Sequence, residues 1–190
     1  MSTQFNAKPQ TKRKTPLVVT LLIVGLISLL LGWAASHWTN SSEPPVLEQE
    51  TWKTFLKAEW RSPDGQVLDT SQWANKTVVL NFWGSWCPPC VEEIPMLSKL
   101  SSSLNDKNVL FLGIGIDSPS NIREFLKKSP ISYPVAMGGI DGSNWSKRFG
   151  NDTGALPFTV IINPEGKIIL TKLGKISENE IKKSILKNFN

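Results

Sequence analysis

The stretch "NFWGSWCPPCVEEIP", residues 81–95, contains both cysteines of this 190-residue chain. Cys87 and Cys90 are three residues apart, and Pro88 and Pro89 separate them. The residues before this stretch, "TVVL", continue its apolar start and are typical of a buried strand. Proline is preferred at the first position of a helix, where its missing N–H would have no partner. The stretch therefore predicts a strand followed by a helix, with Cys87 as the helix N-cap.

This arrangement of the two cysteines predicts dithiol chemistry. Residues three apart share one face of a helix, so the two sulfurs lie within reach of a disulfide. The helix N-terminus carries a partial positive charge that stabilises a thiolate at Cys87. We expect Cys87 to be exposed and to attack a disulfide, and Cys90 to be shielded and to resolve the mixed disulfide.

Three other roles compete with dithiol exchange. A zinc site needs four ligands, and the chain has one histidine, His37, far from the cysteines in sequence. A structural disulfide that closes so short a loop adds little stability. A binding module that uses the cysteine pair only to hold a peptide or metal partner stays open. We predict no metal site and no cofactor.

The N-terminal part of the chain predicts membrane attachment. Residues 1–16 contain four basic residues and no acid, and residues 17–36 are apolar without an ionisable side chain. About 20 such residues cross a bilayer as a helix, and basic residues on one flank place that flank in the cytoplasm. We predict a cytoplasmic tail (1–16), an anchor in the cytoplasmic membrane (17–36), a linker (37–51) and a periplasmic or extracellular domain (52–190). A cleaved signal peptide is the alternative, although its apolar core is usually shorter.

The remaining 17 basic and 16 acidic residues nearly balance, so the net charge of +5 comes from the tail. This pattern indicates no nucleic-acid partner. Alternating apolar runs and turn signals predict an α/β fold, a mixed central sheet flanked by helices. We expect hairpins over 52–70 and 158–174, strands over 77–84, 108–116 and 133–137, and helices over 88–104, 118–129, 142–150 and 177–189.

"VVLNFWGSWCPPC" (78–90) resembles the active-site block of the thioredoxin superfamily and, more narrowly, of the membrane-anchored TlpA/ResA-like thiol-disulfide reductases. "GALPFTVIINPEGKI" (154–168) is similar to the second motif of that family. The resemblance covers residues 52–190 and implies a thioredoxin-like fold. It implies that Pro157 is cis and faces the cysteines, that Leu156 offers its backbone to a substrate strand, and that Trp86 belongs to the contact surface.

The resemblance also assigns a role to Glu93, which matches the acidic residue that this subfamily keeps near its cysteines. A carboxylate there can exchange a proton with Cys90. The alternative is a solvated surface acid that pairs with Lys99. Where thioredoxin has a buried aspartate, this chain has Asn81, which cannot accept a proton.

The family implies a reductase of disulfides in exported proteins, such as apocytochromes c that await haem, with electrons from a membrane thiol carrier. A disulfide oxidase or isomerase of the same fold is the alternative. Pro88 and Pro89 offer no N–H to a thiolate at Cys87, and this favours the reductase.

Overall fold

The computed structural model describes residues 17–39 and 45–187, and the chain divides into two units at residues 44 and 45. The first unit contains helix α1 (Leu17–Thr39), which covers the predicted anchor, whereas the predicted tail lies outside the described residues. Over the parts of the chain that the structure describes, no helix is both long and apolar enough for a membrane span. The membrane crossing therefore stays a prediction.

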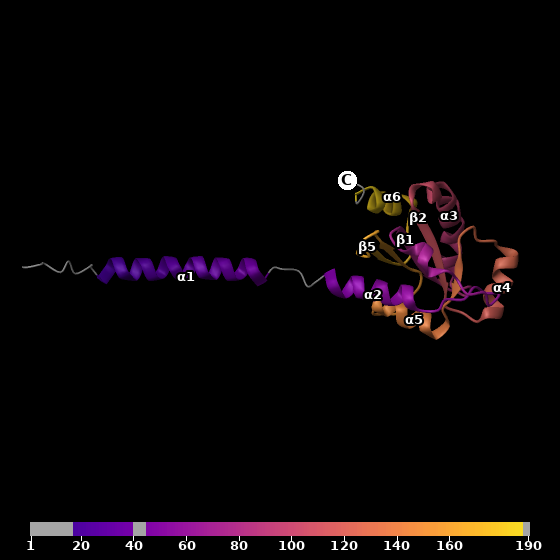
Figure 1. Ribbon diagram of the computed structural model, residues 1–190, viewed down its shortest axis with the longest axis horizontal. Coiled ribbons are helices and arrows are strands. Elements are labelled where there is room, and N and C mark those ends of the chain that lie inside the picture. The colour runs from indigo at the N-terminus through magenta and orange to yellow at the C-terminus, as the bar shows by residue number, and fades with distance from the viewer. Residues whose placement is uncertain (1–16, 40–44, 188–190) are drawn as a thin grey trace, which may run out of the picture. The chain divides into compact units, whose positions relative to one another are not determined.

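The second unit is built on a mixed sheet, as the sequence predicts, and this sheet has five strands (Figure 1). Its strands are β1 (Thr77–Trp83), β2 (Val109–Gly115), β3 (Val135–Met137), β4 (Phe158–Ile162) and β5 (Ile168–Leu173), in the order β3-β2-β1-β4-β5. The pairs β1/β2 and β2/β3 are parallel, and β1/β4 and β4/β5 are antiparallel. The central strand β1 is buried over its whole length, because helices cover both faces of the sheet.

Helices α3 (Pro88–Leu104), α4 (Pro119–Lys128) and α6 (Glu178–Lys187) lie on one face, and α2 (Pro45–Lys57) and α5 (Gly139–Arg148) on the other (Figure 1). Two short 3₁₀ helices, η1 (Thr70–Trp73) and η2 (Asn105–Lys107), precede β1 and β2. Alternate residues of β1 supply the two cores, since Leu80 packs with the α2 side and Val79 with α3 and α6.

The predicted hairpin over residues 52–70 is wrong. Helix α2 occupies Pro45–Lys57, so a helix also begins inside the predicted linker. Trp52 and Phe55 lie three residues apart on this helix, stack with ring centroids 5.3 Å apart and are buried in the core. The burial of these rings favours a helix over the alternation of a strand. Of the hairpin only one bridge remains, between Arg61 and Val67.

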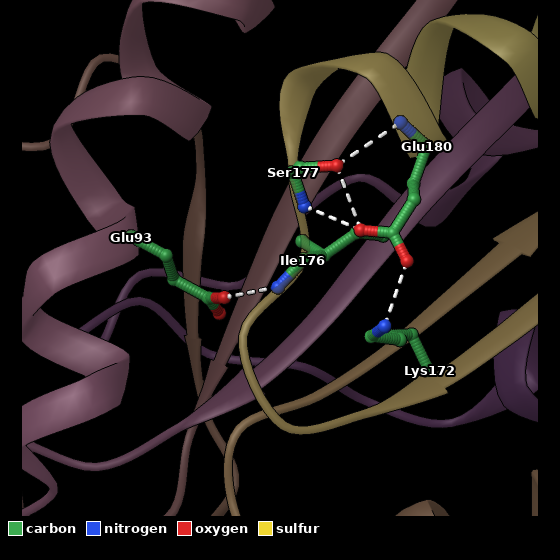
Figure 2. A network of polar contacts seen from close by, with 5 residues as sticks. All are labelled: Glu93, Lys172, Ile176, Ser177 and Glu180. Carbon is green, nitrogen blue, oxygen red and sulfur yellow. Dashed lines mark hydrogen bonds and ion pairs between the residues drawn. The ribbon is translucent and has the colours of Figure 1, made fainter.

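The predicted start of the last helix is confirmed (Figure 2). The Ser177 backbone N–H donates to Glu180 Oε2 at 2.9 Å, and the Glu180 N–H donates to Ser177 Oγ at 3.3 Å, which is a capping box. Lys172 of β5 pairs with the other carboxylate oxygen of Glu180 at 2.7 Å. These contacts fix the β5–α6 loop, whose residue Ile176 contacts the site described next.

Candidate active site

Cys87 and Cys90 form a disulfide with an S–S distance of 2.07 Å and a Cα–Cα distance of 5.3 Å. Cys87 is the N-cap of α3, as predicted, and Pro88 and Pro89 take the first two helical positions. The Cys87 side chain accepts no capping hydrogen bond, whereas its carbonyl oxygen accepts from the Cys90 N–H at 3.0 Å. Strand β1, the turn and α3 together place both sulfurs at the N-terminus of the helix.

The exposure predicted for Cys87 is wrong for this disulfide form. Cys87 is 4% exposed and Cys90 is fully buried. Both belong to an apolar cluster with Trp83 and Ile122, against which Leu156 packs. The sequence identifies the cysteine at the tip of the helix, but it does not show that the loop before β4 covers that tip. Cys90 is still the more buried of the two cysteines, as its predicted role as the shielded, resolving thiol requires.

The loop after β2 holds the turn that leads into the cysteines. The Ser85 hydroxyl donates to Asp117 Oδ2, and the Trp86 indole N–H donates to the Ile116 carbonyl at 3.2 Å. Trp86 itself is 64% exposed, as expected of a contact surface. Sequence reasoning missed Ser85 and Asp117, although an acid directly after a parallel strand lies at the carboxyl edge of the sheet, where sites are common.

Asp117 is held as a carboxylate by its neighbours. Burial acts to raise the pKa of Asp117, but hydrogen bonds from Ser85, Asn121 and the Ser118 N–H outweigh it and keep this pKa below its ordinary value. Asn121 Nδ2 and the Ser118 N–H both donate to Asp117 Oδ1 at 2.7 Å. Asp117 therefore links the cysteine turn to the start of α4.

The loop before β4 contains the second predicted set of site residues. The Leu156–Pro157 peptide bond is cis, as the family resemblance implies. Pro157 is buried, and Leu156 is partly buried against the cluster that contains both cysteines. The fold thus brings this loop, far from the cysteines in sequence, to the cysteine pair.

Glu93 is not the solvated surface acid of the alternative interpretation, because its side chain is only 2% exposed. Its Oε1 accepts a hydrogen bond from Asn81 Nδ2 at 2.8 Å. Its Oε2 accepts from the Ile176 N–H at 3.0 Å (Figure 2). Its neighbour Glu92 is the surface acid, and it pairs with Lys175 at 2.7 Å. One turn of α3 therefore presents one carboxylate to the core and one to solvent.

Burial raises the pKa of Glu93 above its ordinary value. The hydrogen bonds from Ile176 and Asn81 and the positive charge of Lys175 oppose this rise without cancelling it. Glu93 lies three residues after Cys90 on the same helix, and both are buried, so the two side chains face the same side of α3. A buried carboxyl group with a raised pKa can exchange protons closer to neutral pH than a surface acid.

The described residues hold no cluster of three or more histidine, cysteine, aspartate or glutamate side chains that suits a metal ion. The reactive groups that the structure brings together are the cysteine pair and the buried Glu93, with the two loops around them.

Comparison with known proteins agrees with this geometry. The Redoxin family matches residues 55–188. The chain is 25% identical over 171 residues to the thiol-disulfide oxidoreductase ResA of Bacillus subtilis, a match that covers 90% of this chain and 92% of the relative. It is 27% identical over 164 residues to ResA of Halalkalibacterium halodurans, covering 85% and 88% of the two chains.

A solved structure supports the same assignment. The thioredoxin-related protein from Neisseria meningitidis serogroup B is 31% identical, with a TM-score of 0.61. The match covers 70% of this chain and 100% of that protein. With its cysteine pair at the start of a helix, this chain belongs to the Redoxin family and is a TlpA/ResA-like thiol-disulfide oxidoreductase of the thioredoxin superfamily.

Proposed function

We propose that this protein reduces disulfides in exported proteins, with apocytochromes c among its substrates, while residues 17–36 hold it in the cytoplasmic membrane. A membrane thiol carrier supplies the electrons. The family assignment supports dithiol–disulfide exchange. The observation that carries the direction of electron flow is the pair of prolines at the first two positions of α3.

A thiolate at a helix N-cap is normally stabilised by N–H groups of the first helical turn. Pro88 and Pro89 have no N–H, and the Cys87 side chain accepts no capping bond. In thiol-disulfide oxidoreductases, oxidising power follows from stabilisation of the reduced form. Weak stabilisation of the Cys87 thiolate leaves the disulfide relatively favoured, so the reduced protein should give its electrons away.

The exchange proceeds in two balanced steps. The Cys87 thiolate attacks one sulfur of the substrate disulfide, forms a mixed disulfide and releases the other substrate sulfur as a thiolate, which takes up a proton. Glu93 then accepts the proton of Cys90, whose thiolate attacks the Cys87 sulfur and releases the second substrate thiol. The protein ends as the Cys87–Cys90 disulfide, and a dithiol donor returns it to the reduced form with two electrons.

Trp86 and Leu156 are the proposed substrate contacts, because they lie on two loops that meet at the cysteines. Trp86 is exposed on the cysteine turn, and Leu156 borders the cysteine cluster from the loop before β4. An extended substrate segment can pair with the backbone at Leu156 while its side chains contact the Trp86 ring.

The proposed anchor rests on the sequence. Residues 17–36 lack ionisable side chains, a basic tail precedes them, and the described apolar side chains of residues 21–30 are exposed on α1. A reporter fused after the last residue should be active only outside the cytoplasm. A mature chain that begins near residues 36 and 37 would instead indicate a cleaved signal peptide.

Trapping of the mixed disulfide tests the reductase. Cys90→Ser should retain a substrate protein on Cys87, since the resolving thiol is absent, and the double variant that also carries Cys87→Ser is the matched control. Equilibration of the wild-type protein with glutathione then tests the direction. A reduction potential near that of thioredoxin, about −270 mV, supports the reductase, whereas a value near about −120 mV would make the protein an oxidase.

A further inference from the structure

Three buried polar atoms on the α3 side of the sheet have no hydrogen-bond partner among the described residues. They are Asn81 Oδ1, Trp83 Nε1 and the Tyr133 hydroxyl. Native proteins rarely leave a buried polar atom unpaired, so each such atom indicates a partner that the protein chain itself does not supply. Asn81 and Tyr133 are 1% and 6% exposed, and Trp83 is fully buried.

These three side chains surround one position, Gly113 of β2. Asn81 is the register partner of Gly113 on β1, and Trp83 lies two residues further along the same face of that strand. A side-chain carbon at Gly113 would lie 3.0 Å from Trp83 Nε1 and 3.2 Å from the Tyr133 ring. The glycine therefore leaves room for the Trp83 indole and the Tyr133 ring over its backbone, beside its register partner Asn81.

Glu93 borders the same place. Its Oε1 accepts from Asn81 Nδ2, and that amide nitrogen also donates to Thr159 Oγ1 at 3.0 Å. Both contacts fix the amide, so Asn81 Oδ1 is left for another donor. Burial first, and the negative charge of Glu93 second, raise the pKa of Tyr133 far above its ordinary value. Tyr133 is thus a neutral O–H donor close enough to Glu93 to respond to its charge.

We propose that Asn81, Trp83 and Tyr133 enclose a water molecule that links the Tyr133 hydroxyl to the Glu93 carboxylate. Its hydrogen-bond capacity fits the site: the water accepts from the Trp83 N–H and the Tyr133 O–H, and it donates to Asn81 Oδ1 and Glu93. Buried waters commonly make two to four such bonds. Tyr133 is then a positioning residue, which stabilises the Glu93 carboxylate through the water.

The effect on catalysis depends on the proposed proton exchange between Glu93 and Cys90. The water site itself does not depend on that exchange. Removal of the Tyr133 hydroxyl removes one donor from the water, so the carboxylate loses support and the pKa of Glu93 rises further. The acid limb of the pH–rate profile should move to higher pH by the same amount. Tyr133 is the only tyrosine of the chain, so its hydroxyl can be followed by NMR without ambiguity.

Tyr133→Phe tests the water link. We expect ordered water density within hydrogen-bond distance of the Tyr133 and Trp83 donors in a high-resolution crystal structure of the wild-type protein. We expect the variant to raise the pKa of Glu93, followed by carbon-13 NMR, by about half a unit to one unit. Ser132→Ala is the matched control, because it removes a neighbouring hydroxyl that donates to the Ser98 carbonyl at 2.7 Å instead.

A truly unpaired Tyr133 hydroxyl would give the opposite result. Its removal would raise the melting temperature and leave the pKa of Glu93 unchanged, and this pair of outcomes would overturn the proposal. The absence of water density at the site in the wild-type crystal structure would also overturn it. If Tyr133→Phe does not fold, the wild-type crystal structure alone decides. If Glu93→Gln leaves turnover unchanged while Tyr133→Phe shifts the pKa of Glu93, the water link stands and the proposed role of Glu93 in proton exchange fails.

Discussion

The two faces of strand β1 differ in chemistry although they alternate along one strand. Val78, Leu80 and Phe82 point to the face covered by α2 and α5, where they join an apolar cluster that is rich in aromatic side chains. Asn81 and Trp83 point to the face covered by α3, where Glu93 and other polar groups are also buried. Neighbouring residues of β1 thus contribute to two different environments, an aromatic core and the polar surroundings of the cysteine site.

This difference shows how the fold combines stability with a reactive site. The aromatic face holds Phe55 at the centre, with ring centroids of Trp60, Phe149 and Trp145 4.6, 5.6 and 5.2 Å away. It gains its stability from apolar burial, and its buried polar groups are paired within the chain, as the Trp60 indole N–H is with the Phe55 carbonyl at 3.0 Å. The α3 face gives up some apolar contact to bury a carboxyl group beneath the cysteines. We therefore expect changes on the two faces to have separable effects.

The largest expected effect is on the cysteine pair itself. Cys87→Ser should abolish turnover of a protein disulfide, because no thiolate remains to attack, and it should leave the fold intact. Turnover can be followed as the reduction of insulin or of a dithiobis-nitrobenzoate reagent. Detectable multiple turnover by this variant, or trapping of substrate on Cys90 instead, would reverse the roles assigned to the two cysteines.

The aromatic face gives the second effect, on stability. Phe55→Ala should lower the free energy of unfolding by about 3–5 kcal/mol, since Phe55 is fully buried among other rings. Urea unfolding measures this change, and Leu186→Ala, at a 66% exposed position, is the control. The rate of exchange by the folded fraction should stay near that of the wild type. A large loss of that rate would show that the aromatic face also shapes the site.

Local signals in the sequence predict much of this architecture. The extent of α3, Pro88–Leu104, agrees with the prediction, because a strand, an N-cap and a proline at the first helical position are adjacent in the chain. The turn sequence between the two strands predicts the β4–β5 hairpin. The cis bond before Pro157 follows from the family resemblance alone, since its local sequence also suits an ordinary turn.

The features that the sequence does not predict depend on contacts between distant segments. Residues 52–57 form a helix because Phe55 packs on Phe149 and Trp145 of a segment far along the chain. The family resemblance alone separates Glu93 from its neighbour Glu92, which we expect at the surface, and the packing of α3 on the sheet buries Glu93 as that resemblance implies. The contact from Ser85 to Asp117 likewise requires the parallel pairing of β1 with β2.

Glu93→Gln should change the chemistry of the α3 face more than its stability. We expect the rate of exchange near neutral pH to fall by about 10²-fold, a typical contribution of a general acid or base. The amide keeps hydrogen-bonding capacity in the buried site but cannot take up a proton. Since burial raises the pKa of Glu93, the acidic limb of the wild-type pH–rate profile should be missing from the variant.

Glu92→Gln is the matched control for that substitution, because it changes the exposed neighbour on the same turn of α3. Its pH–rate profile should equal that of the wild type. Equal profiles for wild type and Glu93→Gln would remove Glu93 from the proposed mechanism and leave it a purely structural buried acid.

The smallest expected effect concerns Asp117, which links the cysteine turn to the start of α4. The pKa of this carboxyl group lies below its ordinary value, so its ionised form stabilises the folded protein above the unfolded-state pKa of about 3.8. That stabilisation is lost as pH falls through the lower folded-state pKa. Asp117→Asn should therefore reduce the free energy of unfolding by about 1 kcal/mol at neutral pH, the typical value for such hydrogen bonds.

The pH dependence distinguishes this effect from a general loss of packing. The difference in unfolding free energy between wild type and Asp117→Asn should be constant near neutral pH and shrink as pH falls below about 4, because protonation of Asp117 removes the same interactions in the wild type. Asp152→Asn, at an exposed position, is the control for loss of one negative charge. Urea unfolding at several pH values gives the comparison. A difference that persists unchanged at low pH would assign Asp117 a steric role in the turn, independent of its charge.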